Sequence, residues 1–122
     1  MPNNNQDAGS LWDMMQAIQE IQADVNGLTW EDFLDNRTIR RAVERNFEIL
    51  GEAARRISIK FQSLHPQIDW GGIIGLRNVL AHQYESIRYE VLWNVIVDHL
   101  PNLKLNIEAL LPPIGEDLQN DR

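Results

Sequence analysis

The chain has 122 residues, of which 43% are hydrophobic and 24% are charged, a length and composition typical of one globular domain. It contains no cysteine, which excludes disulfide bonds, thiolate nucleophiles and zinc sites built on sulfur. Eighteen acidic and eleven basic residues give a net charge of −7, which argues against a protein held to nucleic acid by bulk electrostatics. Any contact with an anionic partner must therefore be local.

The two ends of the sequence are polar. The N-terminal sequence MPNNNQDAGS has neither the basic nor the apolar region of a signal peptide, and no apolar run approaches the roughly 18 residues that span a bilayer. We therefore expect a cytoplasmic protein without membrane contact. Residues 1–9 are expected to be a disordered tail, residues 10–111 a helical domain, and residues 112–122 a flexible acidic tail.

The first half of the domain predicts two long helices. Ser10 followed by Asp13 is a helix-start signal, and the helix is expected to close at Gly27. Thr29 then opens a short acidic turn. The next helix is predicted to be the longest, because apolar residues recur at spacings of three and four over about seven turns: Ile39, Val43, Phe47, Leu50, Ala54, Ile57 and Phe61.

The second half predicts two further helices. His65-Pro66 breaks the chain, and Asp69 can cap the helix that follows. The last helical pattern runs from Leu92 to Leu110, and Pro101 forces a kink or a break into two pieces. Since no alternating strand pattern competes, the predicted fold is all-α, an antiparallel bundle of four to five helices.

A basic segment crosses this acidic chain. Residues 37–60 carry seven basic and three acidic side chains. Arg40 with Glu44, and Glu52 with Arg56, have the i,i+4 spacing of solvated helix pairs, which contribute only a few tenths of a kcal/mol each. The basic segment alone therefore does not identify a binding partner.

The third predicted helix contains the candidate chemistry. Steps of three and four residues from Trp70 lead to Arg77, which places a guanidinium inside an apolar stripe. Because a buried unpaired charge is costly, Arg77 must face a carboxylate, a water-filled cleft, a subunit interface or an anionic ligand. His82 follows five residues later, about 140° around a continuous helix, so the two side chains do not converge unless the helix ends near His82 or a second chain takes part.

An arginine and a histidine without a nearby thiol, serine triad or carboxylate pair suit phosphodiester chemistry in which the substrate supplies the nucleophile. Histidine can take the proton of a ribose 2′-OH, and arginine can stabilise charge on the phosphoryl oxygens. Metal hydrolysis is disfavoured because the three histidines lack H-x-x-x-H spacing. His65 and His99 are interpreted as packing residues.

The string RNVLAHQY fits the R-x4-H-x-Y motif, and the chain thereby resembles the HepT-like branch of the HEPN superfamily. Three tracts, the second of which contains this string, resemble successive blocks of that family in the same order, over roughly residues 10–111: IRRAVERNFEILGEAARRIS, HPQIDWGGIIGLRNVLAHQY and VLWNVIVDHLPNLK. Members of this branch are the all-α partners of minimal nucleotidyltransferases in toxin–antitoxin pairs.

The resemblance implies a metal-independent endoribonuclease that needs no cofactor, acts on RNA and not on DNA, and works as a homodimer. Arg77 and His82 of both protomers would meet in one cleft, with Asn78 as a supporting group. Tyr84 would accept AMP from a nucleotidyltransferase (MntA-like) antitoxin. If the helix continued past His82, Tyr84 would lie about 10 Å from Arg77 on the same face.

Two other functions compete with a ribonuclease toxin. One is a non-catalytic HEPN module that uses Arg77 to hold a nucleotide or a protein partner. The other is a purely structural helical adaptor. Glu52 is interpreted as the structural partner of Arg56.

Overall fold

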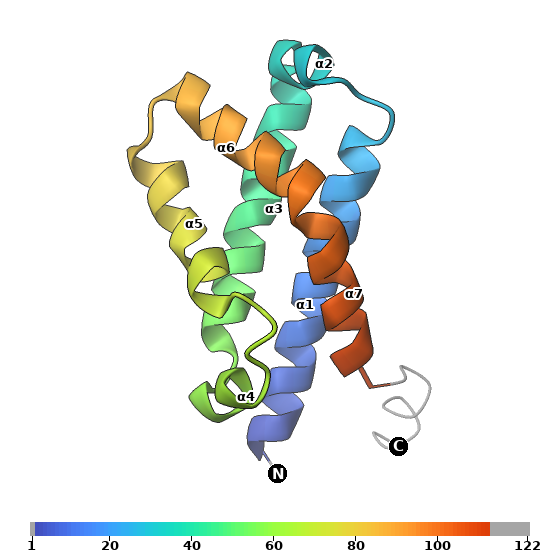
Figure 1. Ribbon diagram of the computed structural model, residues 1–122, viewed down its shortest axis with the longest axis vertical. Coiled ribbons are helices and arrows are strands. Elements are labelled where there is room, and N and C mark those ends of the chain that lie inside the picture. Colours follow the sequence, from blue (N-terminus) through green and yellow to red (C-terminus); the bar gives the residue numbers. More distant parts are fainter. Residues whose placement is uncertain (1, 113–122) are drawn as a thin grey trace.

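The computed structural model describes residues 2–112, with side chains from residue 6 onward. Within this range it contains seven helices and no strand, which confirms the predicted all-α class, although four to five helices were expected (Figure 1). The helices are α1 (Pro2–Val25), α2 (Trp30–Asp35), α3 (Arg37–Arg56), α4 (Ile59–Leu64), α5 (Trp70–His82), α6 (Glu85–Asp98) and α7 (Leu100–Leu110). No helix in the described part of the chain is both long enough and apolar enough to cross a membrane.

The long helices form an antiparallel bundle. The chain runs along α1, returns along α3, ascends again in α5 and descends through α6 and α7 (Figure 1). α3 packs against both α1 and α5, and α7 packs against α1. The amphipathic pattern explains this arrangement, because the apolar stripes of these helices meet in one core. Its largest fully buried side chains include Met14, Ile18, Phe33, Phe47, Leu50, Leu92, Leu100 and Ile107.

Most predicted helix boundaries agree with the structure. α1 ends before Gly27, which has a positive φ of 78° that glycine adopts without strain. Thr29 caps α2 in a reciprocal capping box with Asp32, so the acidic turn is a short helix. The last helical pattern divides at His99 into α6 and α7, with a proline in the first turn of α7 as its chemistry allows.

The predicted seven-turn helix is wrong, because it is two helices. α3 ends at Arg56, and Ser58 begins α4 by accepting a hydrogen bond from the Phe61 amide. The amide and the hydroxyl of Ser58 both donate to the Asp7 carboxylate, each at 2.8 Å. In a continuous helix the Ser58 amide would donate to a backbone carbonyl one turn earlier. Here the Asp7 carboxylate accepts from it instead, so the helix can break without leaving that amide unpaired.

The contact between Asp7 and Ser58 also shows that the N-terminal residues around Asp7 belong to the folded domain. α1 begins at Pro2, ahead of the predicted start at Ser10, and Asp7 is buried at 4% exposure. A disordered tail was expected over residues 1–9, but residues 2–9 are helical. The apolar pattern begins only at Leu11, whereas Asp7 is held by a residue 51 positions away. The predicted C-terminal tail, from residue 113 on, lies outside the described residues.

We expect Asp7→Ala to lower the free energy of unfolding by about 1–2 kcal/mol, because it leaves the Ser58 amide without its acceptor. Urea denaturation followed by circular dichroism measures the change. Asp13→Ala on the exposed side of the same helix is the matched control and should change stability by less than about 0.5 kcal/mol. Equal stabilities of the two variants would show that the contact does not hold α1 to α4.

Candidate active site

α5 carries the R-x4-H residues, and both of its ends are defined. Asp69 caps its start by accepting a hydrogen bond from the Gly72 amide at 3.0 Å. Trp70, Ile73 and Leu76 are buried and anchor the helix. The helix ends at His82, because Gln83 has an extended backbone. The sequence left open whether this helix ends near His82 or continues, and the structure shows that it ends there.

Arg77 is exposed on α5 and lines an open cavity of about 390 Å³ between α5 and α3. The other lining residues are Arg45, Glu48, Glu52, Leu80 and Ala81. Among the described residues no carboxylate lies within 4 Å of Arg77, so its guanidinium is unpaired. The cost of placing arginine in an apolar stripe is thus avoided by a solvent-filled cavity.

Glu52 is the acidic neighbour of Arg77 that the sequence analysis assigned to a structural role. It forms an ion pair with Arg55 at 2.6 Å and with Arg56 at 3.7 Å, so its predicted pairing with Arg56 is confirmed. The hydrogen bond from Arg55, with the charges of Arg55, Arg56 and Arg77, holds the pKa of Glu52 below its usual value. Glu52 is therefore an anion in this cavity rather than a proton donor.

Gly51, which played no part in the sequence-based predictions, lies where α3 meets α5. It is buried, and a Cβ atom there would lie 3.4 Å from the Ile73 carbonyl oxygen of α5. α3 thus lies against α5 at Gly51, and the next residue, Glu52, faces the cavity that Arg77 lines. Arg45 and Glu48 occupy the cavity from earlier turns of α3 and were also missed as site residues.

His82 is the last residue of α5 and is exposed, as is Asn78. Neither belongs to the cavity that Arg77 lines. Because α5 is one continuous helix from Arg77 to His82, their side chains leave it about 140° apart and about 7.5 Å along the axis. Within one chain the structure does not bring the two groups together.

Tyr84 does not continue α5. Its backbone is extended, and it is the N-cap residue of α6 without a side-chain capping bond. The alignment of Tyr84 with Arg77 on one helical face required a helix that continues past His82, and it does not occur because α5 stops at His82. The Tyr84 side chain is 81% exposed and stands just after the end of the helix that carries Arg77 and His82.

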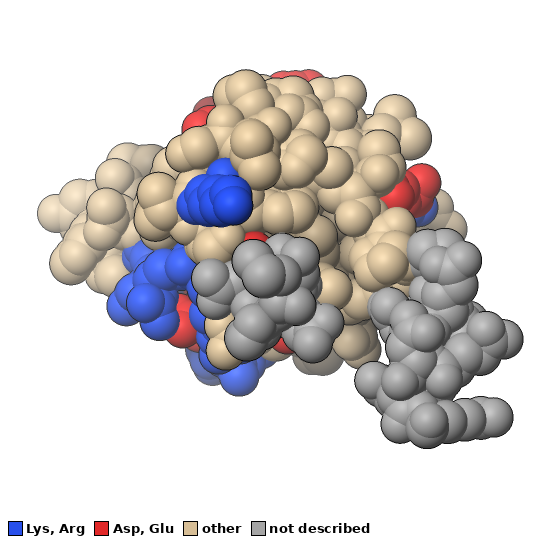
Figure 2. Space-filling view, turned by 90° about the horizontal axis from the view of Figure 1, so that it is seen from below, with Lys and Arg blue, Asp and Glu red and all other residues tan. Residues whose placement is uncertain are grey.

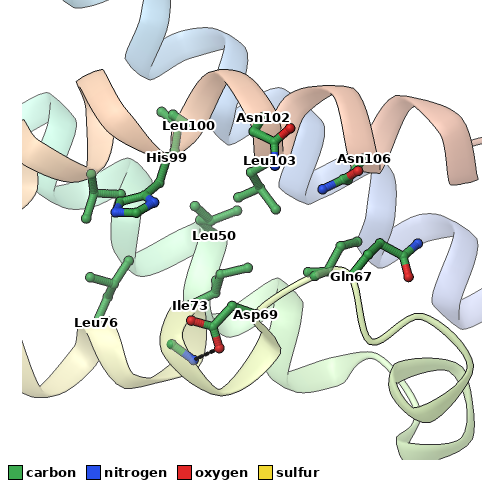
Figure 3. A pocket seen from close by; sticks show the side chains of 13 residues that line it. Leu50, Gln67, Asp69, Ile73, Leu76, His99, Leu100, Asn102, Leu103 and Asn106 are labelled. Atoms are coloured by element: carbon green, nitrogen blue, oxygen red, sulfur yellow. Dashed lines mark hydrogen bonds between the residues drawn. The ribbon is translucent and has the colours of Figure 1, made fainter.

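The other two histidines lie elsewhere. The His65 ring stacks against Phe61, with ring centroids 4.4 Å apart, as expected of a packing residue. His99 is exposed and borders a separate cavity of about 320 Å³, which is lined by apolar side chains such as Leu50, Ile73 and Leu103 (Figure 3). None of the predicted site residues lines this cavity near His99.

The basic segment is a real surface feature, but one of its predicted pairs is wrong. Seen from the end of the molecule near α4, most visible lysines and arginines lie together on one side (Figure 2). Glu44 pairs with Arg88 of α6 at 3.2 Å, and Arg40 pairs with Glu85 at 3.9 Å. Contacts between helices thus replace the expected Arg40–Glu44 pair, because α6 packs across this part of α3.

A family model described as Ribonuclease HepT-like matches residues 14–110. The chain belongs to the ribonuclease HepT-like family. A Thermococcus cleftensis protein named "Probable ribonuclease HepT" is 36% identical over 82% of this chain and 91% of its own length. Two Methanocaldococcus jannaschii proteins named "Putative RNase" are 33% and 34% identical, over 88% and 82% of this chain and 89% and 92% of theirs. No solved structure matches the chain.

Membership of the HepT-like family confirms the resemblance inferred from the RNVLAHQY string. The matched region spans α2 to α7 together with the second half of α1. The cavity beside Arg77 and the exposed His82 therefore belong to a ribonuclease-type domain.

Proposed function

We propose that the protein is a metal-independent endoribonuclease whose catalytic residues are Arg77 and His82. The unpaired, exposed guanidinium of Arg77 in the cavity between α3 and α5 carries the proposal. A positive charge kept free of carboxylate partners can bind a phosphate, and Arg offers two donors to phosphate oxygens. Similarity to proteins named as ribonucleases supports RNA, not DNA, as the polymer.

The reaction requires no nucleophile from the protein. The ribose 2′-oxygen attacks the adjacent phosphorus while His82 takes its proton, and Arg77 stabilises the negative charge that develops on the phosphoryl oxygens. The bond to the 5′-oxygen breaks, and that oxygen takes a proton from water. The products are a 2′,3′-cyclic phosphate and a 5′-hydroxyl. Asn78, one residue after Arg77, is proposed to help position the phosphate.

We propose that the active form is a homodimer. On one α5 the Arg77 and His82 side chains diverge, whereas a two-fold axis beside two copies of α5 would place the arginine of one chain near the histidine of the other. The exposure of Arg77, Asn78, His82 and Tyr84 leaves this end of α5 free to meet a second chain.

We further propose that the protein is the toxin of a cytoplasmic toxin–antitoxin pair and is silenced by AMP transfer to Tyr84. The Tyr84 oxygen would attack the α-phosphorus of ATP bound to the nucleotidyltransferase antitoxin, forming a phosphodiester and releasing pyrophosphate. The 81% exposure of Tyr84 and its place directly after His82 support this role. The added anion would lie beside the proposed catalytic groups.

We expect cleavage of RNA to persist in EDTA and to leave 2′,3′-cyclic phosphate ends, because the attacking oxygen is the substrate's own 2′-OH. Incubation of the purified protein with total RNA, followed by end-group analysis, tests this. DNA and 2′-O-methyl RNA serve as controls and should not be cut. A requirement for added divalent metal, or cleavage of DNA, would show that an activated water is the nucleophile instead.

A further inference from the structure

A second charged cavity, of about 600 Å³, lies between α3 and the start of α6, at the end of the bundle that carries α2 (Figure 1). Four arginines line it, together with three glutamates and Tyr89: Arg37, Arg40, Arg41 and Arg88. In a chain of net charge −7, this concentration of guanidinium groups needs a reason.

Two of the arginines are explained by the contact between α3 and α6. The guanidinium carbons of Arg40 and Arg88 lie 4.9 and 5.1 Å from the centre of the Tyr89 ring. The Tyr89 hydroxyl donates to Glu44 at 2.7 Å, and Glu44 also pairs with Arg88. Arg40 donates in addition to the Leu34 carbonyl. These contacts fix both guanidinium groups in place.

The fixed arginines still have unused hydrogen-bonding capacity. The Nε atoms of Arg40 and Arg88 are buried, and neither makes a hydrogen bond within the described residues. The Arg88 Nε is 3.2 Å from Glu44, close enough for an ion pair but not aligned as a hydrogen bond. The acid opposite Arg40 is Glu85, at 3.9 Å and with a side chain 69% exposed, so that pair is weak.

The other two arginines have no structural explanation. Arg37 and Arg41 are exposed on the first two turns of α3, and within residues 2–112 neither lies within 4 Å of a carboxylate. They nevertheless line the same cavity as the rigid pair. Two fixed and two free guanidinium groups around one open cavity are suited to phosphate, which arginine binds with paired donors.

The cavity adjoins the candidate active site. Glu48 lines both this cavity and the one that contains Arg77. Arg41 and Glu52 are eleven residues apart on α3, which corresponds to about 16 Å along the helix. If the phosphate that is cut lies at Arg77, another phosphate farther along the same RNA strand can therefore lie in this cavity.

We infer that the cavity lined by Arg37, Arg40, Arg41 and Arg88 is a phosphodiester-binding subsite that holds the RNA backbone away from the bond that is cut. The inference rests on the proposed ribonuclease function and extends it. The subsite contributes affinity for long RNA without taking part in the chemical step, and it reads the backbone rather than the bases.

The test is the salt dependence of binding to a 2′-O-methyl RNA of about 20 nucleotides, measured by fluorescence anisotropy. In the double variant Arg37→Gln/Arg41→Gln, the slope of log affinity against log salt should be shallower by about 1.4, because each lost phosphate contact with single-stranded nucleic acid contributes about 0.7. Lys60→Gln/Lys104→Gln removes the same charge from α4 and α7 and should leave the slope unchanged.

Cleavage kinetics provide the second measurement. With long RNA the double variant should show a raised KM and an unchanged kcat, and with a dinucleotide that the wild type cuts it should show neither change. An unchanged salt slope in a variant that binds RNA would overturn the subsite and leave the ribonuclease intact. Absence of RNA binding and cleavage in the wild type would instead overturn the proposed function.

The competing source of a phosphodiester is AMP attached to Tyr84 of the same chain. If the arginine variant binds long RNA as the wild type does but is no longer silenced when Tyr84 is modified, the cavity receives the AMP group and the RNA subsite is wrong.

Discussion

Replacing either Arg77 or His82 by alanine should lower the rate of RNA cleavage by about 10² to 10⁴. His82 is proposed to move the proton of the 2′-OH, and Arg77 to stabilise charge on the phosphoryl oxygens. Both side chains are exposed on the second half of α5, so their removal leaves no cavity in the core. Cleavage of a labelled RNA under single-turnover conditions measures the effect, and helical circular dichroism should be unchanged.

His65→Ala is the control for this experiment. Its ring packs against Phe61 and has no proposed contact with substrate, so the cleavage rate should equal that of the wild type. Full activity of Arg77→Ala or of His82→Ala would remove the proposed mechanism. A selective loss in His65→Ala would show that the catalytic histidine has been misassigned.

A mixed dimer can show where the two halves of the site come from. If Arg77 of one protomer works with His82 of the other, a dimer of one Arg77→Ala chain and one His82→Ala chain retains one complete site. Each homodimeric variant has none. Co-expression with two different affinity tags isolates the mixed species, which should regain about half of the wild-type rate when each intact site acts independently. An inactive mixed dimer would mean that both residues must come from one chain, against the 140° separation on α5.

Local signals in the sequence were sufficient to predict the frame of the site. Asp69 has the side chain of a helix cap and does cap α5, and the stripe of Trp70 and Ile73 does anchor that helix in the core. Gly27 and Pro101 mark helix ends by backbone geometry alone. Features of this kind depend on residues within one or two turns of each other, so periodicity and capping rules can detect them.

The features that were missed depend on contacts between distant segments. The break between α3 and α4 is fixed by Asp7, 51 residues before Ser58, and no periodicity records such a pair. Glu44 matches Arg40 by spacing but pairs with Arg88, since α6 brings a closer guanidinium. Arg77 fits an apolar stripe by angle, yet α3 leaves an open cavity beside it. Each case is a tertiary contact that overrides a valid local rule.

The two tyrosines of the chain differ sharply in access, and this decides where an AMP group can be added. Tyr84 is 81% exposed, whereas Tyr89 is 4% exposed, donates its hydroxyl to Glu44 and lies between two guanidinium groups. A nucleotidyltransferase must reach the tyrosine oxygen with the α-phosphate of ATP. Only Tyr84 offers that oxygen without first separating α6 from α3.

We therefore expect a cognate nucleotidyltransferase, supplied with ATP and Mg²⁺, to add AMP to the wild-type protein and to silence its ribonuclease activity. Tyr84→Phe should retain its helical content and its cleavage activity but escape both modification and silencing. We expect inhibition because Tyr84 lies two residues after His82, where an added phosphodiester anion and purine would occupy the proposed path of RNA. Intact-mass spectrometry and a cleavage assay on the same samples measure the two effects.

Tyr89→Phe is the matched control, because it removes the other tyrosine hydroxyl and should leave AMP addition unchanged. It also removes the hydrogen bond to Glu44, so its folding is checked by thermal unfolding before the comparison is made. The same mass added to Tyr84→Phe would move the acceptor to another residue. Modification of Tyr84 without loss of cleavage would show that Tyr84 accepts AMP but does not control the site, because a bulky anion two residues from His82 should impair cleavage if His82 is catalytic.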